Sequence, residues 1–172
     1  MGRRGLTILY TGNGKGKTTA SLGQILRAVG HGFKVCVIQF IKGRWPTGEA
    51  KACEALAQVE FHVMGSGFTW REGPEETKRS AEEGWSLAEA KILGGDYDLV
   101  VLDELTYLIT YRLVEEDRIL TVIRNRPGKV HLVMTGRDAS PALVEAADLV
   151  TEMREIKHPY ASGVKAQAGI EF

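Results

Sequence analysis

The sequence predicts an α/β fold, in which a mostly parallel sheet of about six strands carries helices on both faces. Three observations favour it. Short apolar runs alternate with longer stretches of helical periodicity along the whole chain. The run KVCVIQF, residues 34–40, is almost continuously apolar, which is typical of a strand covered on both faces. A glycine-rich loop lies directly between the first apolar run and the first helical stretch.

The first half of the chain supplies the first three expected strands. Residues 6–11, LTILYT, are rich in β-branched and aromatic side chains and favour a strand. Residues 18–31 repeat apolar side chains at helical spacing until two glycines end the pattern. The apolar strand 34–40 follows, and then a loop that contains glycine and proline. We expect a second helix that ends near residue 58 and a third strand over residues 59–64.

The second half continues the alternation of strand and helix. After a glycine-rich loop, Pro74 suits the first turn of a long helix that runs to about residue 93. The apolar run YDLVVLDE, residues 97–104, is the fourth expected strand, and the helical stretches after it break near residues 124–128. The remaining expected elements are a strand (129–136), a short helix (141–147) and a sixth strand (148–153).

Composition and charge narrow the class of protein. The 172 residues are enough for one domain, which we expect to span residues 1–172. Lys plus Arg and Asp plus Glu each number 22, whereas nucleic-acid-binding domains normally carry a basic excess. No apolar run has the length of a membrane span, and the first one is too short for a signal peptide. We therefore expect a cytoplasmic protein without nucleic-acid or membrane partners.

The stretch TGNGKGKTT, residues 11–19, is a candidate phosphate-binding loop. It follows an expected strand and opens an expected helix, which is the context that this motif requires. Glycines let backbone N–H groups turn toward one anion, and the helix N-terminus adds positive charge. Lys17 would reach the outer phosphates, and the Thr18 hydroxyl would meet Mg²⁺. The nucleotide-binding candidates here are Gly12, Asn13, Gly14, Lys15, Gly16, Lys17, Thr18 and Thr19.

This loop is one residue shorter than the usual pattern of Gly, four residues and Gly-Lys-Ser/Thr. Only three residues separate Gly12 from Gly16. The alternative is an ordinary glycine-rich turn, but the Gly-Lys-Thr core in a strand–helix context favours phosphate binding. The missing residue raises the question of whether the loop serves a reaction other than phosphoryl transfer. The chain has no Asn-Lys-x-Asp motif, which favours ATP over GTP.

Two acidic residues, Asp103 and Glu104, end the fourth expected strand. Carboxylates there can hold Mg²⁺ directly or through water. A helix N-cap with an acidic partner in its first turn is the alternative. Beside the glycine loop the metal interpretation is favoured, and it adds Thr18 as a ligand.

Two arginines are further candidates for the nucleotide site. Arg137 ends the fifth expected strand, on the side of the sheet where α/β proteins bind ligands. It contacts either a phosphate or the base, or it is a surface arginine. Arg27 lies on the first expected helix and reaches either the nucleotide or a neighbouring subunit.

The motif GFTW places Phe68 and Trp70 in a loop that is rich in glycine. Large aromatic side chains in such a loop need something to pack on. They either fill the core or a dimer interface, or they form a lid over a large flat ligand. Physical reasoning on the residues alone favours packing.

Taken together, these stretches resemble the corrinoid adenosyltransferase family, which acts in cobalamin synthesis and salvage and has a RecA-like P-loop NTPase fold. The family shares the shortened loop. The matching stretches are TGNGKGKTT, RAVGHG (27–32), QFIKGRWPTGE (39–49), GFTW (67–70), VVLDELTY (100–107), RPG (126–128), TGR (135–137) and KHPYASGVKAQAGIEF (157–172).

The resemblance implies transfer of the 5′-deoxyadenosyl group of ATP to Co(I) of a corrinoid, with release of triphosphate. Backbone N–H groups, Lys15, Lys17 and Mg²⁺ would stabilise the charge that develops on the leaving group. Cobalt is the nucleophile, so no general base is needed. In relatives, aromatics of the matching loop displace the lower axial ligand of the corrin, and this role carries over to Phe68 and Trp70. The implied catalytic residues are Lys17, Thr18, Phe68 and Trp70.

The resemblance also implies a homodimer and an electron donor that supplies Co(I). The alternative function is a RecA-type ATPase or nucleotide switch without corrinoid chemistry. It explains the glycine loop and the acidic pair, but it leaves GFTW and residues 157–172 unexplained. The reaction products distinguish the two: triphosphate and adenosylated corrinoid, or ADP and phosphate.

Overall fold

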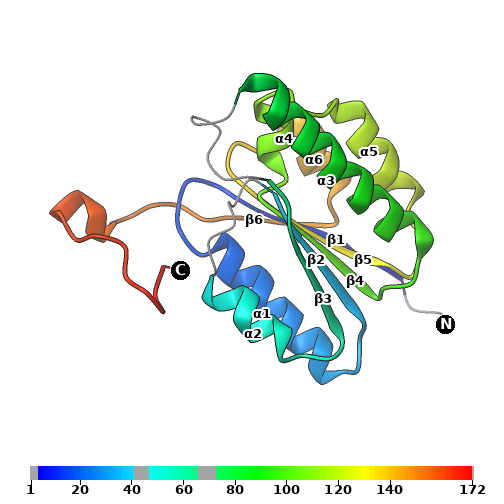
Figure 1. The fold of residues 1–172 in the computed structure, drawn as a ribbon, viewed down its shortest axis with the longest axis horizontal. Coiled ribbons are helices and arrows are strands. Elements are labelled where there is room, and N and C mark those ends of the chain that lie inside the picture. Colours follow the sequence, from blue (N-terminus) through cyan, green and yellow to red (C-terminus); the bar gives the residue numbers. More distant parts are fainter. Residues whose placement is uncertain (1–3, 41–46, 66–72, 172) are drawn as a thin grey trace.

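The strands form one parallel sheet in the computed structural model, which describes residues 4–40, 47–65 and 73–171 (Figure 1). Within these residues the strand order is β3-β2-β4-β5-β1-β6, and every neighbouring pair is parallel. The strands are β1 (Thr7–Thr11), β2 (Val35–Gln39), β3 (Val59–Val63), β4 (Leu99–Asp103), β5 (His131–Thr135) and β6 (Leu149–Glu152). The predicted α/β class with a parallel sheet is confirmed.

The helices cover both faces of the sheet, as predicted. Figure 1 shows α1 (Lys17–Gly30) and α2 (Gly48–Glu54) on one face. The helices on the opposite face are α3 (Pro74–Gly94), α4 (Thr106–Thr110), α5 (Glu116–Asn125) and α6 (Pro141–Ala146). A short 3₁₀ helix, η1 (Pro159–Ser162), lies in the segment after β6.

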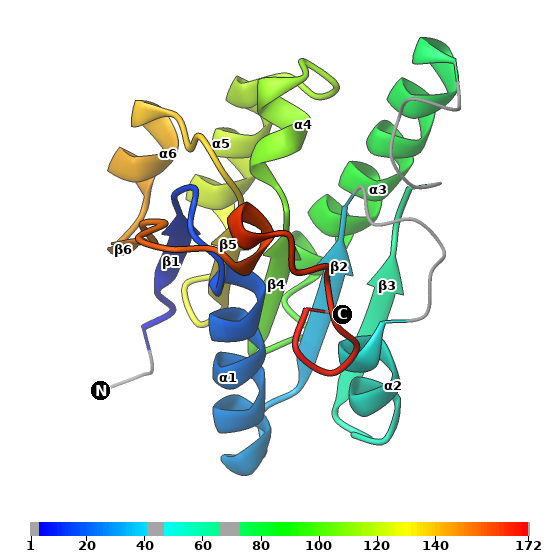
Figure 2. The same cartoon turned by 90° about the vertical axis from the view of Figure 1, so that its left-hand side faces the viewer.

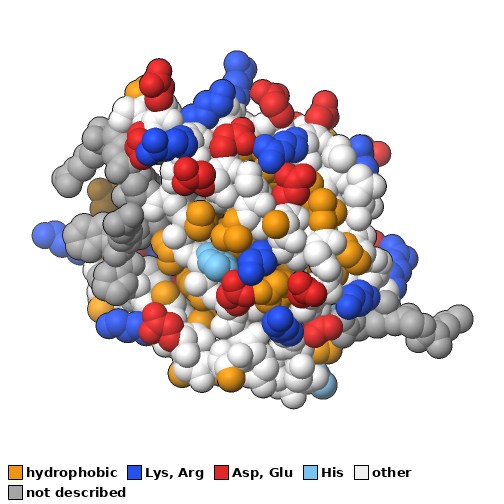
Figure 3. All heavy atoms as spheres, turned by 45° about the vertical axis from the view of Figure 1, so that its right-hand side comes forward, with side chains coloured by type: hydrophobic (Ala, Val, Ile, Leu, Met, Phe, Trp, Pro, Cys, Tyr) orange, Lys and Arg blue, Asp and Glu red, His pale blue; other side chains and the backbone are white. Residues whose placement is uncertain are grey.

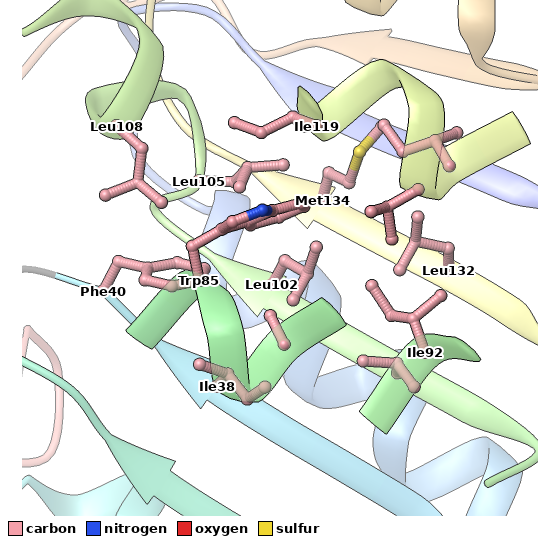
Figure 4. Packing of buried hydrophobic residues seen from close by; sticks show 14 of the residues in the cluster. Ile38, Phe40, Trp85, Ile92, Leu102, Leu105, Leu108, Ile119, Leu132 and Met134 are labelled. Atoms are coloured by element: carbon pink, nitrogen blue, oxygen red, sulfur yellow. The ribbon is translucent and has the colours of Figure 1, made fainter. Parts of the chain in front are cut away.

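Two apolar layers hold the helices to the sheet. All residues of β2 and β4 are buried, and successive side chains of these strands enter opposite layers. Val35 and Val37 pack with α1, whereas Ile38 packs in the layer that contains Trp85 of α3. Figure 4 shows Trp85 lying against Met134 of β5 in this second layer. The continuously apolar strands predicted from the sequence are therefore the centre of the sheet.

One helix is shorter than predicted, and the helical stretches expected after the fourth strand are two separate helices. The second helix ends at Glu54 rather than near residue 58, because tight turns follow it, with Leu56 N–H donating to Cys53 O at 3.0 Å. The helical residues between β4 and β5 form two helices, α4 and α5. The break between them includes Arg112, whose backbone is left-handed with φ of 53°.

The edge of the sheet and the segment after it are the most exposed part of the fold. All residues of β6 are exposed, and the chain then leaves the sheet (Figure 2). It returns far enough for Glu171 to form an ion pair with Lys15 in the loop before α1. On the face that Figure 3 shows, basic and acidic side chains are intermixed.

Strand order determines where the polar strand ends meet. β4 lies between β2 and β5, and β5 lies beside β1. The register pairs Gln39 with Asp103 and Tyr10 with Thr135. The carboxyl ends of four strands therefore converge beside the N-terminus of α1, where an open α/β sheet binds its ligands.

Candidate functional site

The glycine loop between β1 and α1 has the backbone that an anion site needs. Gly12 and Gly16 have φ of 94° and 112°, a left-handed region that favours glycine. Gly16 is the N-cap of the 14-residue α1 and provides no side-chain cap. The first N–H groups of α1 therefore receive no hydrogen bond acceptor from a capping side chain, and they are placed to meet an anion.

The loop packs tightly against the backbone that follows β6. Gly14 N–H donates to Met153 O at 2.7 Å. A Cβ atom at Gly14 would lie 2.7 Å from the carbonyl carbon of Arg154, and one at Gly12 would lie 2.5 Å from Met153 O. Two glycines are thus required by a close approach of backbones that the motif alone does not reveal.

Lys17 is folded back into the loop. Its Nζ donates to Gly12 O at 2.7 Å and to Gly14 O at 2.8 Å, and only 7% of the residue is exposed. Burial lowers the pKa of Lys17, and the nearby Glu104 carboxylate acts in the opposite direction. The ammonium is therefore held at the centre of the loop, where an anion would replace the two carbonyl oxygens as its partner.

Asp103 joins the loop to the end of β4. The Thr18 hydroxyl donates to Asp103 Oδ1 at 3.0 Å, and the Thr135 hydroxyl donates to the same oxygen at 2.7 Å. Asp103 is only 1% exposed. The structure thus brings together two of the predicted metal ligands, Thr18 and Asp103, in one hydrogen-bonded group.

The helix-cap alternative for this acidic pair does not match the geometry. The residue at the N-cap of α4 is Leu105, and no side chain caps that helix. Glu104 lies between the strand and the helix with φ of 63°, and its N–H donates to the Thr135 hydroxyl at 2.9 Å. Its half-buried side chain is close enough to Lys17 to raise the pKa of that ammonium.

Gln39 and Glu49 also belong to this group, although the sequence analysis did not select them. Gln39 Nε2 donates to Asp103 Oδ2 at 2.9 Å and to Glu49 Oε1 at 3.5 Å. The available signal was a polar side chain at the end of an otherwise apolar strand. Such a residue lies at the carboxyl edge of the sheet whenever the strand is parallel.

The two arginine candidates lie at different distances from the loop. Arg137 is exposed at the end of β5, and its charge lowers the pKa of Lys17, so it lies near the loop. The preceding Gly136 has φ of 147°, and a Cβ there would lie 2.0 Å from the Thr106 hydroxyl oxygen. Arg27 is exposed near the end of α1, about 15 Å along the helix from Lys17 at 1.5 Å per residue.

Other candidates are placed only in part. Asn13 and Thr19 are exposed around the loop, and Lys15 forms its ion pair with Glu171. Phe68 and Trp70 lie outside the described residues. Across residues 4–40, 47–65 and 73–171, no group of three or more His, Cys, Asp and Glu side chains is arranged to hold a metal ion. Mg²⁺ in nucleotide sites commonly uses one or two carboxylates together with the phosphates of the substrate.

Comparison with known proteins identifies the family. A family model described as "ATP:corrinoid adenosyltransferase BtuR/CobO/CobP" matches residues 3–172. The chain belongs to this family. A corrinoid adenosyltransferase of Pseudomonas aeruginosa is 45% identical over 98% of this chain and 84% of its own length. One from Escherichia coli K12 is 45% identical over 98% of this chain and 86% of its own length.

The fold of this adenosyltransferase family member also has a distant likeness among solved structures. The flagellar accessory protein FlaH from Methanocaldococcus jannaschii matches with a TM-score of 0.60 at 12% identity, over 88% of this chain and 72% of that one. This likeness agrees with the α/β fold class that the parallel sheet of the structure confirms. Within the part of the adenosyltransferase that the structure describes, no helix combines the length and apolar character of a membrane span.

Proposed function

We propose that this adenosyltransferase transfers the 5′-deoxyadenosyl group of ATP to Co(I) of a corrinoid and releases triphosphate. Membership of the family gives the reaction class. The observation that carries the site assignment is the hydrogen bond from Thr18 in the loop to the buried Asp103 at the end of β4. This hydrogen bond connects the glycine loop to the carboxylate at the end of β4.

The loop would hold the triphosphate as a leaving group. A phosphate entering it would take the place of Gly12 O and Gly14 O as the partner of Lys17. The uncapped N-terminus of α1 would add its N–H groups, and Lys15 and Arg137 would add positive charge. These groups would favour the separation of triphosphate from the C5′ carbon, because negative charge develops on the leaving oxygen.

The residues at the end of β4 fit a magnesium ion. Thr18 and Asp103 would hold it together with the phosphates, and Glu104 would act directly or through water. The fit rests on the buried Asp103 carboxylate, which accepts hydrogen bonds from two hydroxyl groups and one amide beside the loop. When bound, the ion would neutralise charge on the triphosphate and orient it.

The remaining parts of the proposal extend beyond the described residues or beyond one chain. Phe68 and Trp70 would contact the corrin and displace its lower axial ligand. The protein would be a cytoplasmic single-domain homodimer supplied with Co(I) by an electron donor. Arg27, exposed and distant from the loop of its own chain, would then lie against the partner subunit or near its nucleotide.

An anaerobic assay tests the proposed reaction. Chemically reduced Co(I) corrinoid and Mg-ATP are mixed with the protein, the light-sensitive cobalt–carbon product is followed by absorbance, and the released phosphate species is identified. Intact triphosphate with adenosylated corrinoid is the expected result. Thr18→Val should lose most of the activity, whereas Thr110→Val, at an exposed position on α4, should retain it. ADP and phosphate without adenosylated corrinoid would contradict the proposal.

A further inference from the structure

Gln39, at the end of β2, has a buried oxygen that accepts no hydrogen bond among the residues the structure describes. The residue is 1% exposed. Its amide nitrogen donates to Asp103 Oδ2 at 2.9 Å and to Glu49 Oε1 at 3.5 Å. These two bonds use both N–H groups of the side chain. The amide oxygen, Oε1, is buried and has no partner in the described part of the chain.

The orientation of this amide follows from its neighbours. Ionised carboxylates only accept hydrogen bonds, so the nitrogen of Gln39 must face Asp103 and Glu49. Rotating the amide by half a turn would bring its oxygen against Asp103 Oδ2, another acceptor. The unpartnered atom is therefore the oxygen, and a buried acceptor without a donor costs free energy unless a ligand supplies one.

The place of Gln39 in the sheet limits what that donor can be. Gln39 is the register partner of Asp103, and Asp103 accepts from Thr18 in the glycine loop. The ligand expected there carries triphosphate, whose oxygens are acceptors at neutral pH. A hydrated magnesium ion brings O–H donors, because Mg²⁺ keeps several of its waters when it binds a nucleotide site. A ribose hydroxyl is the other source of an O–H donor.

We propose that Gln39 is a positioning residue of the magnesium site, which holds Asp103 and Glu49 with its amide nitrogen and accepts a hydrogen bond from a metal-bound water with its oxygen. This inference rests on the proposed magnesium–triphosphate site. It assigns a role in metal binding to Gln39, the first residue of the motif QFIKGRWPTGE. It also explains why an amide is useful at this position, since only an amide combines both donors with an acceptor.

The test separates metal binding from nucleotide binding. Calorimetry measures binding of inorganic tripolyphosphate and of ATP, each across a magnesium titration and in EDTA. Gln39→Met keeps the length of the side chain and removes its polar atoms. The half-saturating magnesium concentration for tripolyphosphate binding should rise about tenfold, since a hydrogen bond to a charged group has that worth. Binding in EDTA should change less than about twofold.

Two further variants complete the test. Gln39→Asn keeps the amide but shortens the side chain by one methylene, which withdraws its oxygen, so its magnesium requirement should also rise. Gln58→Met, at an exposed glutamine after α2, should match the unaltered protein. Circular dichroism and thermal melting establish that each variant is folded. If Gln39→Met does not fold, the magnesium requirement of Gln39→Asn decides the question: a requirement equal to that of the unaltered protein would overturn the inference.

The other outcomes also discriminate. Equal loss of tripolyphosphate binding with and without magnesium would make Gln39 merely structural and overturn the inference. A loss confined to ATP would identify the donor as a ribose hydroxyl and overturn it as well. Absence of any magnesium effect in the unaltered protein would reject the magnesium site itself, which distinguishes failure of the proposed function from failure of this inference.

Discussion

Replacing Thr135 by valine should destabilise the protein, because the hydroxyl of this fully buried threonine links the Asp103 carboxylate to the backbone N–H of Glu104. Its hydroxyl donates to Asp103 Oδ1 at 2.7 Å and accepts from the Glu104 N–H at 2.9 Å. Valine has nearly the same shape, so the change removes both hydrogen bonds and leaves the packing. A bond to a charged acceptor contributes about 1.5–3 kcal/mol, and loss of a buried acceptor for an N–H costs about 1–3 kcal/mol.

The sum is a loss of about 2.5–6 kcal/mol in the free energy of unfolding. For a domain of this size each kcal/mol lowers Tm by about 2–4 °C, so Tm should fall by about 5–24 °C. Differential scanning calorimetry and urea titration measure both quantities. Thr135→Ser is the matched control, because it keeps the hydroxyl and removes one methyl group, at a cost of about 1 kcal/mol. If the valine variant proved as stable as the serine variant, the bridging role of the hydroxyl would be refuted.

Three further predictions concern the loop, the pH response and the aromatic motif. Gly14→Ala should lower Mg-ATP affinity by about tenfold or more in calorimetry, because its Cβ would collide with the carbonyl of Arg154; Gly23→Ala, where a Cβ meets nothing within 4 Å, should leave binding unchanged. Lys91 of α3 donates a hydrogen bond to the Glu60 carboxylate at 2.7 Å, and this bond lowers the pKa of Glu60 to about 2. Because its folded-state pKa is depressed, the stabilisation is complete above the ordinary value of 4.5 and is lost as pH falls toward 2, so Glu60→Gln should flatten an acid-unfolding curve over that interval; an unchanged curve would contradict it. Trp70→Ala should keep ATP binding but lose most turnover from Co(II) substrate, and turnover equal to that of the unaltered protein would count against a role in displacing the axial ligand.

The alternation of strands and helices was predictable because it depends on local periodicity. The nearly continuous apolar run at residues 34–40 predicts a strand that is covered on both faces, and all residues of β2 are indeed buried. The end of α2 was misplaced by a few residues, since the residues from Ala55 to Gln58 suit a helix and a turn about equally.

The site was predictable where chemistry and topology coincide in a motif. Thr18 and Asp103 were expected to meet, because strand ends of a parallel sheet converge at the helix that follows the loop, and they do form a hydrogen bond. Gln39 lies in a stretch that matches the family, but reasoning on the residues gave it no role, because its partner Asp103 comes from strand pairing between segments far apart in the sequence. The contact of Gly14 with Met153 has the same origin.

This contact between Gly14 and Met153 has a consequence for the order in which the protein is built. The glycine loop is translated well before the residues that pack against it, β6 and Met153. The nascent chain can complete helices such as α1 early, since helices depend on local contacts. It cannot give the loop its final backbone until Met153 has been added. The loop of a growing chain therefore lacks this backbone contact until Met153 has been added and β6 has paired with β1.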